Sequence, residues 1–194
     1  MFVSGFVEQI DEPDQDIHPV DSATTEGATL QAAEDGNYSA LKQLLDANPV
    51  LARVRDSDGY TPTHRAAYND HPDCIELLIE KGADPWARTP DGWLPLHSAA
   101  FWGCPKAAHV ILQTPGAEAY VNAQTNGGLT PLHLVASSRE DQASETAQLL
   151  LLHPAVKYMI RNQAGDTPLD IARRTSKPLA ELFESICDTN VNTV

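Results

Sequence analysis

Three histidines recur at regular spacing and are the residues most suited to chemistry. His64, His97 and His133 each lie two residues after a proline. A file of imidazoles suggests a metal site, but zinc binds histidine nitrogens at about 2.0–2.1 Å, and rings one repeat apart cannot share an ion. We expect each ring instead to bond the preceding threonine and nearby backbone, tying a loop to a helix start. The sequence therefore predicts no metal site and no cofactor.

No other group of residues points to catalysis. The chain has no glycine-rich phosphate loop, no cluster of metal ligands and no nucleophile beside a suitable base. Ser98 directly follows His97, but adjacent residues on a helix point away from each other. We therefore expect that the protein is not an enzyme.

A nine-residue motif contains the histidines and organises the chain. Gly59-Tyr-Thr-Pro-Thr-His-Arg-Ala-Ala67 returns 33 residues later as Gly92-Trp-Leu-Pro-Leu-His-Ser-Ala-Ala100, and the motif starts again at Gly128 and Gly165. Glycine suits a backbone position with positive φ, and proline suits the first turn of a helix. Each motif therefore predicts a helix start. An apolar stripe at i, i+3 and i+4 further along each repeat predicts a second helix.

A period of 33 residues that carries Thr-Pro-Leu-His-x-Ala resembles the ankyrin repeat family. The resemblance implies an all-α fold, an ankyrin repeat solenoid of about five helix-pair units with short β-hairpin loops. Such units bury their apolar faces against each other, so the outer two act as caps. We divide the chain into an acidic disordered tail (1–23), an ankyrin repeat domain (24–187, with units 24–57, 58–90, 91–127, 128–164 and 165–187) and a frayed C-terminus (188–194).

Several positions depart from the family pattern. Thr63 replaces the usual leucine, and Leu94 replaces the usual threonine, which deprives His97 of a hydroxyl partner. The third unit has three extra residues near Gln113 to Tyr120, and we expect them to lengthen a loop rather than a helix. The fourth unit is also long, and its late apolar stripe predicts a longer link between its helices over Ser137 to Ser144.

The charge of the chain is negative and uneven. The net charge is −14, and residues 1–41 hold nine acids with no lysine or arginine. Nucleic acids and anionic membranes attract basic surfaces, so we expect direct binding to neither, whereas basic proteins are suitable partners. Three widely spaced cysteines without Cys-x-x-Cys indicate a reducing compartment, and we find no secretory leader or long apolar run. We therefore expect a place in the nucleus and/or the cytoplasm.

Within the family, the chain closely resembles one animal member over about residues 56–187. The similar stretches include Asp58-Gly-Tyr-Thr-Pro62 and Asp170-Ile-Ala-Arg-Arg-Thr-Ser176. This resemblance implies a small intracellular interaction protein that has no catalytic residues and acts in the positive control of gene expression. We expect a monomer that binds a protein partner.

The partner surface must be sought among exposed positions, because a fold alone does not give a function. The family resemblance implies that the hairpin tips and the exposed ends of the first helices line a concave face. Aromatic residues gather at these positions in two adjacent repeats, and Trp, Tyr and Arg are enriched in binding hot spots. The predicted partner-binding residues are Arg55, Tyr60, Tyr68, Trp86, Arg88, Trp93, Phe101 and Trp102. The alternative is that some of these rings pack between repeats, above all Tyr60 and Trp93.

Two functions are compatible with these patterns. The first is a non-catalytic adaptor that binds a protein partner on the concave aromatic face. The second is a dedicated chaperone or escort of a basic client, which would use the acidic N-terminal tail. A separate hypothesis concerns Asn122, which lies where many ankyrin repeats undergo asparaginyl hydroxylation. Tyr120 replaces the acid usual at that motif, and a structural role is the alternative.

Overall fold

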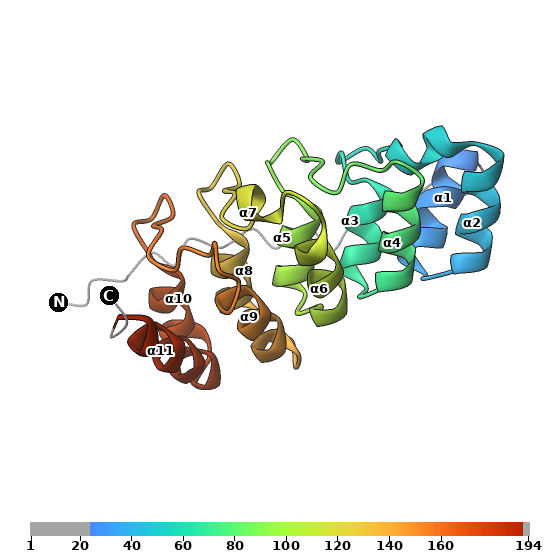
Figure 1. The fold of residues 1–194 in the computed structure, drawn as a ribbon. Helices are drawn as coiled ribbons and strands as arrows, with labels where there is room; N and C mark the ends of the chain where they lie inside the picture. Colours follow the sequence, from blue (N-terminus) through green and yellow to red (C-terminus); the bar gives the residue numbers. More distant parts are fainter. Residues whose placement is uncertain (1–23, 192–194) are drawn as a thin grey trace.

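The computed structural model describes residues 24–191, with side chains described as far as residue 186. The predicted tail, residues 1–23, and residues 192–194 lie outside this part. Five helix pairs stack in a single row, from α1 and α2 at one end to α10 and α11 at the other (Figure 1). The helices are α1 (Thr25–Glu34), α2 (Tyr38–Ala47), the 3-10 helix η1 (Pro49–Arg53), α3 (Pro62–Tyr68), α4 (Pro72–Glu80), α5 (Pro95–Phe101), α6 (Pro105–Gln113), α7 (Ala117–Tyr120), α8 (Pro131–Ser137), α9 (Ala143–Leu151), α10 (Pro168–Thr175) and α11 (Lys177–Val191). The predicted all-α solenoid is confirmed.

The repeated motif starts the first helix of a pair, as predicted. In α3, the ring Nδ1 of His64 accepts a hydrogen bond from the backbone N–H of Thr61 at 3.2 Å and lies 2.9 Å from its hydroxyl. The motif of α8 makes the same two contacts. In α5, His97 bonds only the backbone N–H of Leu94, at 3.0 Å. These bonds satisfy backbone groups that a helix start leaves unpaired.

The second ring nitrogen of each histidine bonds the following repeat. The Nε2 atom of His64 lies 3.2 Å from the carbonyl oxygen of Trp93, and that of His97 lies 3.0 Å from the carbonyl oxygen of Ala123. Because Nδ1 accepts, Nε2 carries the proton and donates. Both nitrogens are thus used within the fold. In the described residues, no three or more His, Cys, Asp and Glu side chains are grouped to hold a metal ion.

Tight turns connect the repeats where β-hairpins were expected. The backbone N–H of Asp56 donates to the carbonyl of Tyr60 at 3.0 Å, and no strand follows anywhere in residues 24–191. The turn therefore closes without a ladder. Gly59 has a φ of 82°, and a Cβ there would lie 2.5 Å from Cδ of Pro90 in the next turn. Glycine serves both the left-handed backbone and the close approach of successive turns.

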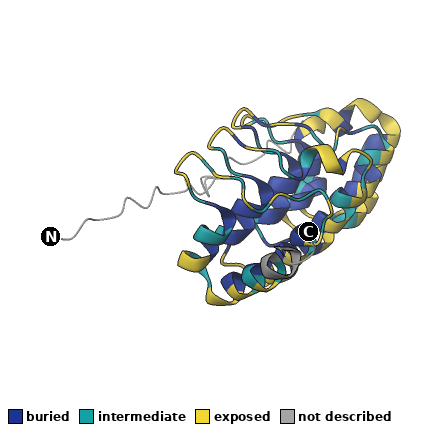
Figure 2. Cartoon of the chain, turned by 60° about the vertical axis from the view of Figure 1, so that its left-hand side comes forward, coloured by how far each residue is buried: buried dark blue, intermediate teal, exposed yellow. Residues whose placement is uncertain are grey.

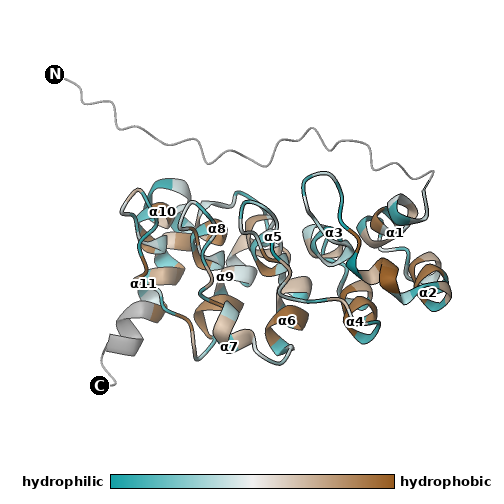
Figure 3. Ribbon diagram, turned by 90° about the horizontal axis from the view of Figure 1, so that it is seen from above, coloured by the Kyte–Doolittle hydropathy of each residue, from teal (hydrophilic) through white to brown (hydrophobic). Residues whose placement is uncertain are grey.

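The core runs along the row between the two helices of every pair. Ala66, Ala67, Ala99 and Ala100 are fully buried, and their small side chains let the first helices of neighbouring pairs approach closely. Larger side chains such as Leu96 fill the space between pairs, and full burial of one leucine stabilises the fold by about 1.5–3 kcal/mol. Figure 2 shows the most buried helices behind the loops, and Figure 3 shows hydrophobic segments within α2, α4 and α6.

Two helices depart from the expected boundaries. The inserted segment of the third unit contains the short helix α7, which was not predicted, while α6 keeps the nine residues of α4, so the extra residues lengthen the connection as expected. Gly116, with a φ of 94°, starts this helix after a turn. Helix α11 continues to Val191, past residue 187 and into the segment expected to be frayed. The longer link in the fourth unit is confirmed, because α8 ends at Ser137 and α9 begins at Ala143.

Candidate functional site

Four predicted site residues form a continuous line of rings, which we call the aromatic row: Tyr68, Trp102, Phe101 and Trp93. The ring centroids are 4.5 Å apart for Tyr68 and Trp102, 5.2 Å for Trp102 and Phe101, and 5.9 Å for Phe101 and Trp93. All three pairs meet edge to face, the arrangement that the charge distribution of aromatic rings favours. The four side chains are half-buried.

The repeat geometry brings these rings together. Tyr68 ends α3 and Phe101 ends α5, 33 residues later, so the two occupy the same place in successive first helices. Trp102 directly follows Phe101, and Trp93 lies in the turn before α5. The tryptophans and the phenylalanine pack against the core on one side. The row therefore packs partly against the core, as the packing alternative predicts for Trp93, and its role in partner binding stays a prediction.

Tyr60 lies beside a buried ion pair network. Its ring contacts His64, and the guanidinium of Arg65 lies 5.7 Å from the ring centroid. Arg65 donates to Asp56 at 2.6 Å and to Glu34 at 3.4 Å, and its side chain is only 13% exposed. One cation thus faces two carboxylates. Sequence reasoning left Arg65 out of the site, although a cation next to the motif histidine was a visible signal.

Trp86 is separate from the aromatic row. Its ring stacks on Tyr120 with centroids 4.7 Å apart and planes 9° from parallel. Tyr120 ends helix α7, so the insertion in the third unit supplies the partner of Trp86. Sequence reasoning did not place Tyr120 in the site, because the insertion has no counterpart in the other repeats.

Arg55 and Arg88 connect successive turns. Arg55 Nη1 donates to the carbonyl of Gly59 at 2.7 Å and to the carbonyl of Arg88 at 2.8 Å. Arg88 Nη1 then donates to the carbonyls of Gly92 and Gln124 at 3.0 and 3.2 Å. Both side chains are exposed, yet their guanidinium groups already bond backbone oxygens. The structure gives these two predicted residues a role within the fold.

Several carboxylates lie near the aromatic row. Asp58 and Asp91 are exposed at the tips of the turns that carry Tyr60 and Trp93. Burial raises the pKa of the Tyr60 hydroxyl, and Asp91 raises it further. Burial also raises the pKa of Tyr68, with a contribution from Glu34. The electrostatic surroundings of both tyrosines are therefore negative.

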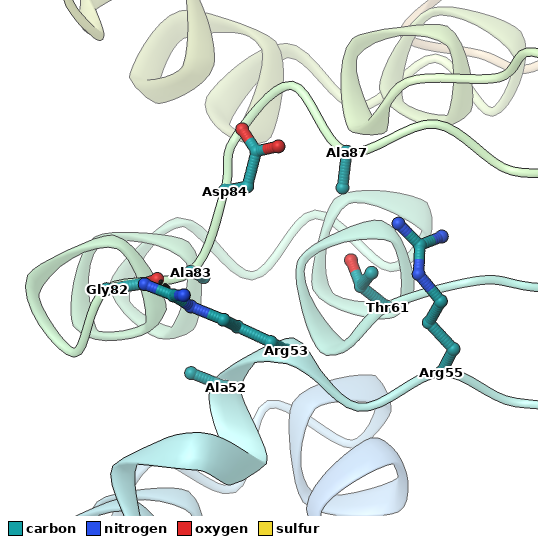
Figure 4. Close-up of a pocket in the computed structure, with 8 residues that line it drawn as sticks. All are labelled: Ala52, Arg53, Arg55, Thr61, Gly82, Ala83, Asp84 and Ala87. Atoms are coloured by element: carbon teal, nitrogen blue, oxygen red, sulfur yellow. Dashed lines mark hydrogen bonds between the residues drawn. The ribbon is translucent and has the colours of Figure 1, made fainter.

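A hollow of about 540 Å³ lies elsewhere, between η1 and the loop after α4 (Figure 4). Figure 4 shows Arg53 extending toward Gly82, whose carbonyl it bonds at 2.7 Å. Arg55 also lines this hollow, but no residue of the aromatic row does. Both arginines are exposed, and the buried hydroxyl of Thr61, which also lines the hollow, is paired with the ring of His64 at 2.9 Å, so we assign the hollow no ligand.

Asn122 serves the fold through both atoms of its amide. Its Nδ2 donates to the carbonyl of Ala155 at 2.7 Å, and its Oδ1 accepts from the backbone N–H of Lys157 at 2.7 Å. The structural alternative for Asn122 is thus confirmed, and its modification stays a prediction.

Burial suppresses the reactivity of three groups that could act as nucleophiles or bases, namely His64, His97 and Cys104. Burial lowers the pKa of His64 to about 4 and that of His97 to about 3, so both rings are neutral near pH 7. Burial raises the pKa of the Cys104 thiol to about 12, which leaves almost no thiolate. In residues 24–191, no helix is long and apolar enough to span a membrane.

These features define a repeat protein of the ankyrin class. A family model described as ankyrin repeats (3 copies) matches residues 29–123, and one described as ankyrin repeats (many copies) matches residues 96–151. The chain belongs to the ankyrin repeat family, whose members generally mediate protein–protein interaction.

The chain is similar to ankyrin repeat domain-containing protein 49 of several animals. It is 46% identical to the Homo sapiens protein over 147 residues, which cover 76% of this chain and 59% of that protein. The Bos taurus protein is 46% identical over 146 residues, 75% of this chain and 59% of the relative. The Drosophila melanogaster protein is 38% identical over 86 residues, 44% of this chain and 39% of the relative. This chain therefore matches less than two thirds of the length of these relatives.

Proposed function

We propose that this protein is a non-catalytic adaptor that binds a protein partner through the aromatic row. The observation that carries the proposal is the row itself: four large rings lie half-buried across two adjacent repeats, and Trp93, Phe101 and Trp102 pack against the core. Rigid aromatic side chains lose little conformational entropy on binding and dominate the energy of many interfaces. The neutral buried histidines and the protonated Cys104 favour binding over catalysis.

The test is capture of partners from the native cell with the full chain as bait. The variant Trp93→Ala/Trp102→Ala removes two rings of the row, and Trp86→Ala is the matched control because Trp86 stacks on Tyr120 outside the row. Circular dichroism and thermal unfolding show whether each variant folds. We expect the double variant to lose a partner that the wild type and Trp86→Ala retain, at a cost of about 2 kcal/mol or more. Undiminished capture by a folded double variant would refute the proposal.

The second candidate is a chaperone or escort of a basic client, supported by the nine acids in residues 1–41. Such a client would bind through long-range charge, so its affinity would fall steeply with salt. Replacing the acids at 1–23 by their amides in the full chain separates the two candidates. An adaptor partner keeps its affinity in that variant, whereas a tail-bound client loses it.

A place in the nucleus and/or the cytoplasm, and a role in the control of gene expression, belong to the same proposal. Imaging of the tagged full chain tests its location in the cell. Loss of the protein followed by transcript profiling, with rescue by wild type but not by Trp93→Ala/Trp102→Ala, tests the role in gene expression.

A further inference from the structure

The acids of the turn tips occur in the repeats that carry the aromatic row. The third residue of the turn is Asp58 in one repeat and Asp91 in the next, whereas Gly127 and Ala164 occupy the same place in the last two turns. All four positions are exposed, so burial does not explain the difference. Negative charge is concentrated at the turns beside the rings.

A further carboxylate lies at the other end of the row. A Cβ placed on Gly103, the residue after Trp102, would lie 2.9 Å from Cβ of Glu140. Glu140 is exposed, and it also contributes to the raised pKa of Tyr68. It comes from the long link between α8 and α9, which reaches back toward the end of α5. The row therefore has Asp91 in the turn before α5 and Glu140 beyond its end.

In the described residues, no ion pair involves Asp58, Asp91 or Glu140. Arg65 is already bound to Asp56 and Glu34, so that group carries one net negative charge. Arg55 bonds turn carbonyls and lines the hollow of Figure 4, and Arg88 makes the same bonds one repeat later. Neither arginine contacts a ring of the row.

We propose that the partner segment that binds the aromatic row is basic, with two arginine side chains against the row, one guanidinium group directed toward Asp91 at one end and the other toward Glu140 at the other end. This inference rests on the proposed function and names the chemistry of its partner. A guanidinium stacks on aromatic faces, and its aliphatic stem covers apolar surface. The flanking carboxylates then pair with its charge and repel acidic segments.

The test uses defined peptides and the three tryptophans of the full chain as separate reporters. The probe is a short peptide in which arginine alternates with leucine. A second peptide carries citrulline in place of arginine, which keeps the shape and removes the charge, and a third carries glutamate. Indole N–H signals in NMR spectra report on Trp93 and Trp102 in the row, and the signal of Trp86 is the internal control. Affinities are measured by fluorescence anisotropy.

Two double variants that remove the same number of charges distinguish binding at the row from a general attraction to an acidic protein. Asp91→Asn/Glu140→Gln neutralises the acids at the row. Glu118→Gln/Glu145→Gln removes the same charge at exposed positions on α7 and α9. A purely general attraction to an acidic protein would affect both equally. A site at the row affects only the first.

We expect the arginine peptide to shift the Trp93 and Trp102 signals and to leave Trp86 in place. The citrulline peptide and the Asp91→Asn/Glu140→Gln variant should each bind roughly tenfold more weakly or worse, and the glutamate peptide should not bind. Equal binding of the citrulline peptide, equal effects of the two double variants, or no shift of the row signals would overturn the inference. If partner capture still depends on Trp93 and Trp102 in that case, the adaptor proposal stands and only the proposal that the partner is basic is refuted.

Discussion

The ring of His64 and the backbone carbonyl of Trp93 are joined by a hydrogen bond of 3.2 Å. One side chain of the second repeat thus holds the residue that begins the aromatic row in the third. His133 makes the equivalent contact with the carbonyl of Asp166, whereas His97 bonds the carbonyl of Ala123, six residues before the equivalent Leu129. The imidazole that bonds the helix start through Nδ1 therefore also holds, through Nε2, the residue that begins the aromatic row.

These histidines predict how stability depends on pH. In the folded chain, burial lowers the pKa of His64 to about 4 and of His97 to about 3, from the ordinary value of 6.5. At pH values between the lowered pKa of the folded chain and the ordinary value of 6.5, the unfolded chain binds more protons than the folded chain. Protonation therefore favours unfolding. The free energy of unfolding should fall as the pH drops from 6.5 to 4, by up to about 1.4 kcal/mol per pH unit for each histidine.

Urea unfolding at a series of pH values measures this dependence. The variant His97→Asn should unfold more easily at pH 7 and show a shallower slope, because one titrating group is gone. His109→Gln changes an exposed histidine and should keep the wild-type slope. A flat profile for the wild type between pH 4 and pH 6.5 would contradict the neutral buried rings.

Thr63 is a defect in the core that substitution should repair. It takes the place that Leu96 and Leu132 occupy in later motifs, and its buried hydroxyl has no hydrogen-bond partner. An unpaired buried hydroxyl costs roughly 1–3 kcal/mol. Thr63→Val removes that cost at nearly constant volume and should raise the free energy of unfolding. Thr146→Val is the matched control, because Thr146 is equally buried but its hydroxyl donates to the Gln142 carbonyl at 3.2 Å. It should not gain stability, and a loss for Thr63→Val would show that its hydroxyl is paired.

Alanine substitutions at two motif glycines distinguish the cost of backbone strain from the cost of crowding by a neighbouring turn. Gly92 and Gly165 have φ values of 83° and 84°, so an alanine is strained equally at both. A Cβ at Gly92 would lie 3.2 Å from the backbone nitrogen of Asn126, whereas a Cβ at Gly165 meets nothing within 4 Å. Gly165→Ala should cost about 1 kcal/mol and Gly92→Ala clearly more. Equal costs in thermal unfolding would mean that the turns move apart freely.

The hydrogen bonds of Arg88 to two backbone carbonyls predict which substitutions the protein tolerates at this position. Gln124 at the equivalent place makes the same type of bonds, to Gly128 at 2.8 Å and Arg161 at 3.4 Å. Arg88→Gln should therefore stay close to wild type in stability, and Arg88→Ala should lose about 0.5–1.5 kcal/mol. Both should still capture the partner of the aromatic row. A binding loss without a stability loss would return Arg88 to the partner-binding set.

The fold was predictable because its signals are local. A helix start with threonine, proline and histidine satisfies its own backbone within four residues, so residue types alone reveal it. The turns were predicted less well. A turn with a left-handed glycine that is closed by a single backbone hydrogen bond has the same residue types as a β-hairpin, so the sequence does not distinguish the two. Helix α7 was missed because an insertion that occurs once offers no repeat for comparison.

The site was predictable only where side chains contact side chains of neighbouring motifs. Tyr68 and Phe101 share a repeat position, so their proximity follows from the period. Trp86 could not be separated from them, because its partner Tyr120 lies in the insertion. Arg55 and Arg88 bond backbone carbonyls, which residue types do not reveal, and their part in partner binding stays a prediction.

The connection from turn to turn also bears on how such an array changes length. Arg55, Arg88 and Gln124 each end on the carbonyl of the next residue in the series, and Arg161 receives the last of these bonds. Every residue has a backbone carbonyl, so the link imposes no side-chain identity on its acceptor. After a unit is duplicated or deleted, the side chain in one turn could still bond the backbone carbonyl of the turn that then follows it. Gene duplication can therefore lengthen this chain without first evolving a matching pair of surfaces.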